Sequence, residues 1–239
     1  MLSRYRSMAG TLESAFAEPQ SRLHVAVPAT ASPLAAMQLE VGSFTTFTNA
    51  TNSAFLTVRD VGSGKMAFYI RGDGNVGIGT SDPRFPLDVV GMTRTCVLQI
   101  KGGCDIAEPF EMSDAEIPRG ALVRIDDENA GKLKLAGQEY DTRVAGIVSG
   151  AKGVNPGISL SQEGVMDSGQ NVALSGRVYA LADASYGAIK PGDLLTSSGT
   201  PGHVMKVTDH ARAQGAIVGK AMSGLKDGRG MVLVLVTLQ

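Results

Sequence analysis

A glycine-rich stretch at residues 72–91, GDGNVGIGTSDPRFPLDVVG, constrains the fold of this chain more than any other feature. Its first four residues, at 72–75, combine types that accept positive φ with types that bond their own backbone, which is typical of a hairpin turn. We expect strands on both sides of that turn, at 66–70 and 76–79, and a further short strand at 86–91.

The strand that follows the turn has two unlike faces. Val76 and Ile78 share one face, whereas Gly77 and Gly79 leave the other face as bare backbone. Such a hairpin cannot bury a core alone, so we expect copies of the chain to associate, with the glycines allowing a neighbouring backbone to come close. The residues expected to pack between copies are Val76, Gly77, Ile78, Gly79, Leu87 and Val89.

This stretch resembles the GNVGIGT-x-x-P-x-x-x-L-x-V-x-G element near the C-terminal stalks of trimeric phage tail fibres and related bacterial fibre proteins. Residues 74–80 match the pattern, as do Pro83, Leu87, Val89 and Gly91. In that family the element is a structural stalk. The resemblance therefore implies a parallel homotrimer without chemistry, placed in a virion tail or an extracellular fibre.

Two other interpretations of the same region are disfavoured. A glycine-rich nucleotide loop must open a helix whose N-terminus faces the phosphate, but these glycines run into Ser81-Asp82-Pro83 and another strand pattern. The tripeptide Arg71-Gly72-Asp73 has the form of an integrin-type adhesion motif. A charged hairpin tip accounts for it more simply.

The composition favours a thin β architecture over a deep enzyme pocket. The 239 residues include 30 glycines and no tryptophan, and aromatic residues make up 5%. A net charge of −1 gives no basic excess that would attract nucleic acid or an anionic membrane. No apolar run of about 18 residues predicts a membrane-spanning helix, and the N-terminus lacks the apolar centre of a signal peptide.

Cysteine and histidine usage predicts neither a disulfide framework nor a metal site. Cys96 and Cys104 are too few to define a framework. The three histidines are scattered at positions 24, 203 and 210, so no metal ligand set is recognisable and no cofactor is expected.

We expect three segments along the chain. Residues 1–36 form an N-terminal linker or attachment segment, through which other fibre or baseplate proteins would bind. Residues 37–101 form a β-rich stem and stalk, and residues 102–239 form a β head domain. Within the stem, the strand-forming residues predict strands at 37–41, 44–48, 55–59 and 93–100.

The head contains an internal repeat. Residues 117–123 (IPRGALV) correspond to residues 189–195 (IKPGDLL). Further matches join 131–133 with 202–204, and 144–148 with 214–218. The unbroken apolar run at 231–237 suits a strand that is buried on both faces.

The strand and turn patterns predict an all-β fold, in which an extended β stem and stalk is followed by a compact, duplicated β barrel or sandwich. The stalk resemblance implies that the stem and stalk are trimeric. Loops at 150–170 and 197–202 are where a cell-surface receptor would bind, since recognition usually lies on loops.

The junction between stalk and head, CDIAEPFE at residues 104–111, resembles the start of the self-cleaving C-terminal domain of some phage neck-appendage proteins. That family is an intramolecular trimerisation chaperone that begins Asp-aromatic-Ala-Glu and is cut just before the Asp. Asp105, Ala107 and Glu108 match this start. Ile106 stands in place of the aromatic residue, and Cys104 in place of the family's serine.

Chemistry at the junction can be written from the residues themselves. Either the Cys104 thiolate attacks the preceding carbonyl, or Asp105 and Glu108 act as acid and base. In the purely structural interpretation, both carboxylates bond backbone amides and Cys104 is a small packed residue. The acidic run at 126–128 is expected to be a solvated turn, because its carboxylates are adjacent rather than spaced for calcium.

The sequence thus predicts a structural component of a homotrimeric fibre, from a phage tail or a related injection machine. Its head would serve as a cap, a trimerisation domain or a receptor-facing domain. The first alternative is an autoproteolytic chaperone that cuts between Cys104 and Asp105. The second is a bacterial surface adhesin, and a conventional enzyme is not expected.

Overall fold

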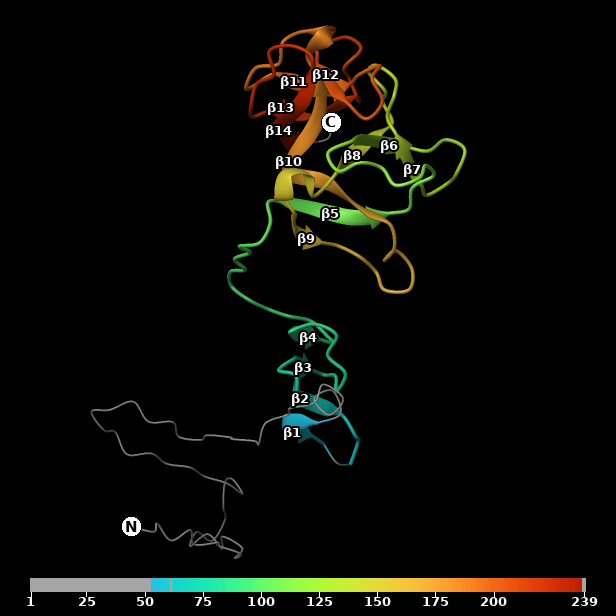
Figure 1. Ribbon diagram of the computed structural model, residues 1–239. Coiled ribbons are helices and arrows are strands. Elements are labelled where there is room, and N and C mark those ends of the chain that lie inside the picture. The colour runs from blue at the N-terminus through green and yellow to red at the C-terminus, as the bar shows by residue number, and fades with distance from the viewer. Residues whose placement is uncertain (1–52, 61, 238–239) are drawn as a thin grey trace, which may run out of the picture. The chain divides into compact units, whose positions relative to one another are not determined.

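The computed structural model describes residues 53–60 and 62–237 (Figure 1). The chain divides into two compact units, residues 1–96 and residues 97–239. The described residues form fourteen β-strands, two short 3₁₀ turns and no α-helix, which confirms the all-β prediction. The elements predicted in 1–36, at 37–41 and at 44–48 lie outside the described residues.

The first unit contains one four-stranded sheet, in the order β1-β2-β3-β4. Strands β2 and β3 are antiparallel, with Phe68 opposite Ile78, and they flank the predicted turn, where Gly74 has a φ of 94°. Strands β3 and β4 are parallel, with Val76 beside Leu87. The strands are β1 (Ala54–Arg59), β2 (Met66–Arg71), β3 (Val76–Ile78) and β4 (Leu87–Val89).

This small sheet encloses no hydrophobic core. Among the described residues from 53 to 92, only Gly77 and Pro83 are buried. Large apolar side chains instead face outward, with exposed fractions of 41% for Ile78, 66% for Phe85 and 60% for Leu87. The described part of this unit therefore presents apolar surface that its four strands do not cover.

Gly77 and Gly79 are constrained by the backbone of the same chain. A Cβ on Gly77 would collide with the Thr80 carbonyl oxygen, and a Cβ on Gly79 would lie 2.8 Å from the Val90 carbonyl oxygen. Gly79 also has a φ of 79°, which L-residues rarely adopt. The close backbone approach expected at these glycines occurs here within one chain.

The strand predicted at 93–100 does not form. These residues belong to no strand, and every one of them is exposed. The prediction is wrong for a physical reason: β propensity reflects how side chains fit a pleated surface, whereas a strand also needs a partner edge for its hydrogen bonds.

The second unit is built around β10, its longest strand, shown in yellow-orange in Figure 1. Its 3₁₀ turns are η1 (Ala151–Gly153) and η2 (Ala184–Tyr186). Its strands are β5 (Asp105–Phe110), β6 (Leu122–Ile125), β7 (Leu133–Leu135), β8 (Val144–Val148), β9 (Pro156–Ser159), β10 (Gln170–Asp183), β11 (Leu194–Ser197), β12 (Val204–Lys206), β13 (Ile217–Ala221) and β14 (Arg229–Thr237).

Five of these strands close into a barrel. β10 pairs with β14, β14 with β13, β13 with β11, and β11 with β12. The ring closes where Ala182 of β10 pairs in parallel with Val204 of β12. The architecture is thus a barrel rather than a sandwich. Its core consists largely of small and β-branched side chains, among them Val178, Ala180, Leu195, Val218, Val232 and Val234.

The N-terminal half of β10 organises the remaining strands. It pairs with β5 and β8, and β6 lies between β8 and β7. Just after β5, Met112 forms an isolated parallel bridge with Leu133 of β7. These strands enclose a second core of Ile117, Ala121, Val123, Leu133, Val148 and Val172.

The last strand, β14, is buried on one face only. Val232, Val234 and Val236 are fully buried, whereas Leu235 is 38% exposed. The prediction of a strand buried on both faces is wrong because a barrel wall has an inner side and an outer side, and alternate residues point to each.

Gly146 of β8 provides a test of this packing. A Cβ at this position would lie 2.5 Å from the Ala173 carbonyl oxygen of β10. We expect Gly146→Ala to lower the free energy of unfolding by about 1–3 kcal/mol, because the β8–β10 pair must move apart. Gly102→Ala is the control, since its Cβ would meet nothing within 4 Å. Equal urea midpoints for the two variants would contradict the pairing described.

Candidate functional site

The peptide bond between Cys104 and Asp105 lies at the start of β5 and is held by its neighbours. The Cys104 amide donates to the Asn155 carbonyl at 3.1 Å, and the Cys104 carbonyl accepts from the Arg177 amide at 3.1 Å. A Cβ on Gly176 would lie 2.6 Å from that same Cys104 oxygen. This bond is therefore an ordered part of the sheet.

Asp105 is buried without a hydrogen-bond partner. The residue is 3% exposed, and neither carboxylate oxygen has a hydrogen-bond partner among the described residues. The Ser149 hydroxyl is likewise buried and without a partner among them. Burial raises the pKa of Asp105. The nearby Ser149 hydroxyl, which makes no hydrogen bond of normal length to the carboxylate, and the Asp105 backbone oppose this rise only in part. The site favours a neutral, protonated carboxyl.

Cys104 is exposed, and Arg177 lies beside it. The Arg177 Nη2 atom donates to the Cys104 sulfur at 3.7 Å. Arg177 could not be found from the junction motif, because it lies far along the chain and reaches the junction only through the pairing of β5 with β10. The expectation that Cys104 is a small packed residue does not agree with its exposure.

Glu108 is not brought together with Asp105. Side chains alternate along a strand, so residues three apart point to opposite faces. Asp105 shares its buried face with Ala107, whereas Ile106, on the other face, is 39% exposed. The two carboxylates therefore do not form an acid and base pair across the bond in this conformation.

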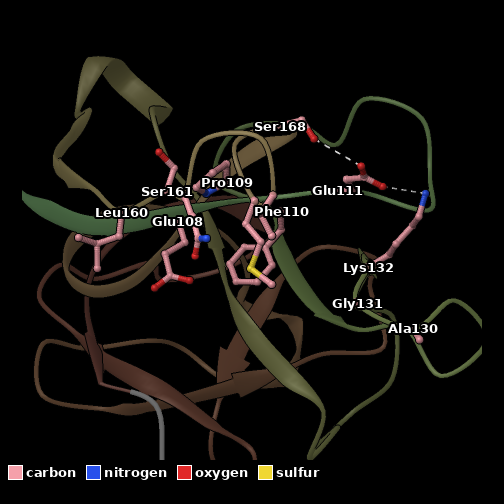
Figure 2. A pocket seen from close by; sticks show the side chains of 13 residues that line it. Glu108, Pro109, Phe110, Glu111, Ala130, Gly131, Lys132, Leu160, Ser161 and Ser168 are labelled. Carbon is pink, nitrogen blue, oxygen red and sulfur yellow. Dashed lines mark hydrogen bonds and ion pairs between the residues drawn. The ribbon is translucent and has the colours of Figure 1, made fainter. Parts of the chain in front are cut away.

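Glu108 instead lines a groove of about 590 Å³ (Figure 2). Figure 2 shows Pro109 and Phe110 in the middle of the groove, with Leu160 to one side and Lys132 on the other. The Lys132 ammonium lies 3.1 Å from a Glu111 carboxylate oxygen. The predicted receptor-facing loop at 150–170 contributes Leu160, Ser161, Gln162, Val165, Met166 and Ser168 to the lining.

The acidic run at 126–128 is a structural turn. Asp126 is buried; its carboxylate accepts from Ser113, Asn129 and the Glu128 amide, and the Lys134 ammonium lies 2.7 Å away. These partners, Lys134 above all, hold the pKa of Asp126 far below its usual value. The prediction of a solvated turn is therefore wrong for Asp126, because its carboxylate is the hub of the turn.

Arg71 and Asp73 of the Arg71-Gly72-Asp73 tripeptide form an ion pair with each other. The Arg71 Nη2 atom lies 2.7 Å from an Asp73 carboxylate oxygen, and Asp73 also accepts from the Asn75 amide at 3.1 Å. These contacts stabilise the hairpin turn, which agrees with the simpler interpretation of this motif.

Comparison of the chain with protein-family models and with curated protein sequences finds no match. Within the described ranges, no cluster of three or more His, Cys, Asp or Glu residues could hold a metal ion. No helix in the same part of the chain is long and apolar enough to cross a membrane.

The buried Asp105 carboxyl predicts a specific pH dependence. With its pKa raised in the folded state, Asp105 keeps a proton that the unfolded chain has already lost above about pH 4. Its contribution to the free energy of unfolding therefore falls as pH rises. We expect Asp105→Asn to become progressively more stable relative to the parent chain as pH increases from about 4 to about 8.

Thermal unfolding across this pH range measures the effect. Asp227→Asn, at an exposed position, is the matched control and should track the parent chain at every pH. A difference between Asp105→Asn and the parent that stays constant with pH would contradict the burial of an unpaired carboxyl.

Proposed function

We propose that this chain is a structural segment of a homotrimeric fibre, with residues 53–92 in the stalk and the second unit as its head. The observation that carries the proposal is the absence of a buried apolar core among residues 53–60 and 62–92. Sheet order is present there, but its large apolar side chains face outward.

A sheet of this size gains little stability by itself. Independent stability of a few strands requires a hydrophobic face packed against something else. Ile78, Phe85, Leu87 and Val90 supply apolar side chains for such packing, with exposed fractions between 41% and 67%. Association of copies through these side chains would bury them, as the stalk resemblance of residues 74–91 implies. The proposal of three copies, rather than another number, rests on that resemblance.

The head is proposed to be a duplicated unit that shares β10. In the first half β6 pairs with β7 and β8, and in the second half β11 pairs with β12 and β13. The β6–β8 pair has a register shift after Val123, and the β11–β13 pair has one after Leu195. Gly146 lies opposite Val123, and Gly219 lies opposite Leu195.

This correspondence refines the repeat inferred from the sequence. The strand pairing aligns residues 144–148 with residues 217–221. Within the sequence alone, the repeat matches the same residues with 214–218, three positions earlier. The parallel bridge of Met112 with Leu133 corresponds to the Ala182 and Val204 pair that closes the barrel. A head of this kind would cap the fibre, assist trimerisation or present a receptor-binding surface.

Self-cleavage between Cys104 and Asp105 is a second candidate, favoured by one observation. The buried Asp105 carboxyl has no partner among the described residues and adjoins the bond that would be cut. Cleavage would add water to the Cys104 carbonyl carbon and release the Asp105 amine, and the Asp105 carboxyl, when protonated, is a potential proton donor to that amine. In this alternative the head would be an intramolecular chaperone that is released after assembly.

The intact mass of the full chain tests both candidates. A denatured subunit of 24.8 kDa that assembles at three times that mass supports a permanent fibre segment. Two denatured fragments split after Cys104 would instead support the chaperone. A native monomer across micromolar concentrations would overturn the fibre proposal.

Leu87 offers a sharper test of the stalk contact. We expect Leu87→Asp to weaken assembly, because each subunit would lose the burial of a leucine, worth about 1.5–3 kcal/mol. The concentration needed for assembly should rise at least about tenfold, as measured by sedimentation. Ser81→Asp adds the same charge at an exposed polar position and should assemble like the parent chain. Equal assembly of both variants would argue against the apolar stalk contact.

A further inference from the structure

Strand β9 leaves one edge of the second unit open. Among the described residues it pairs only with β5, so the backbone groups along its other side have no strand partner. Ile158 and the adjoining Leu160 are 37% and 52% exposed. An open edge with apolar side chains is a template on which another extended segment can add.

The groove described above begins at Leu160, directly after the end of β9, and is both apolar and acidic. Val165 and Met166 are 65% and 70% exposed beside Phe110. Glu108 and Glu111 line the groove, and Asp167 lies next to the lining residue Met166 in the sequence. Lys132 is the single cation among the lining residues. The groove therefore suits an extended segment with apolar side chains and positive charge.

Residues 93–101, TRTCVLQIK, have these properties. In an extended conformation Arg94, Cys96, Leu98 and Ile100 would share one face, because side chains alternate along a strand. Leu98 is 71% exposed and Ile100 is 40% exposed. The segment carries Arg94 and Lys101 and no acidic residue, so its charge is opposite to that of the groove.

We propose that residues 93–101 of one copy bind along β9 and in the adjoining groove of a second copy. Leu98 and Ile100 would cover the apolar lining, and Arg94, on the same face, would meet the acidic rim. The proposal rests on the self-association proposed above. It adds a second contact between copies, which lies outside the stalk and joins the 93–101 segment to the groove. Each copy contributes one segment and one groove, so such contacts can close into a ring.

The native cysteine of the segment allows a direct test in the full chain. In a Cys104→Ser background, Cys96 becomes the single native thiol. Ser161→Cys places a partner thiol in the groove, where Figure 2 shows Ser161. We expect a short bismaleimide to join Cys96 of one copy to position 161 of another, giving covalent oligomers on a denaturing gel, with the linked peptides identified by mass spectrometry.

Control variants separate this contact from others. Cys104→Ser/Ala211→Cys carries its second thiol at an exposed position outside the groove and should give no link from position 96 to position 211. Cys104→Ser alone reports any direct link between two Cys96 residues. The native mass of each variant is measured in parallel, so that loss of assembly is distinguished from loss of this contact.

Charge reversal adds an independent readout. Arg94→Glu should lower the yield of the 96-to-161 link about two- to fivefold, as expected for an exposed ion pair. Adding Asp167→Lys to that variant should restore the yield. A purely structural effect of either substitution would not be rescued by the other.

The outcomes are distinct. Assembly at the native mass of an oligomer without the 96-to-161 link overturns this inference and leaves the fibre proposal standing. A link found within one chain also overturns it, since the segment would then occupy the groove of its own copy. A monomeric native mass overturns both proposals.

Discussion

The pairing of β10 along both of its edges is the interaction on which the second unit depends. Its C-terminal half is matched residue by residue with β14, from Ser175 opposite Thr237 to Asp183 opposite Arg229. Its N-terminal half pairs with β5 and β8. One strand therefore supplies backbone hydrogen bonds to both sets of strands, and the two cores lie against its opposite faces, with Ala173 and Val178 in one core and Val172 and Leu181 in contact with the other.

The stalk unit is stabilised differently. Its strands satisfy one another's backbone groups, but its apolar side chains, such as Leu87 and Phe85, remain exposed. Hydrogen bonds of a small sheet contribute little net stability in water, whereas burial of apolar area is the main favourable contribution to folding. The second unit is therefore stabilised by its own core, and we propose that the first unit is stabilised by association of copies.

Local patterns predicted the parts of the fold that local chemistry decides. The turn at 72–75 and the strands that flank it follow from glycine and asparagine preferences, and the paired motifs at 117–123 and 189–195 indicated the barrel region. Residues 93–100 have the composition of a strand but no partner edge, and the outer face of β14 depends on barrel closure. Arg177 beside Cys104, and the separation of Asp105 from Glu108, follow from strand pairing and alternation, which the motif match did not address.

Hydrogen exchange at two protein concentrations tests the division between head and stalk most directly. The account predicts that amides of β2 and β3 exchange rapidly in dilute solution and become protected as copies assemble, whereas amides of β10 and β14 are protected equally at both concentrations. Protection of β2 and β3 that is strong and independent of concentration would contradict the central claim that the stalk is stabilised by association.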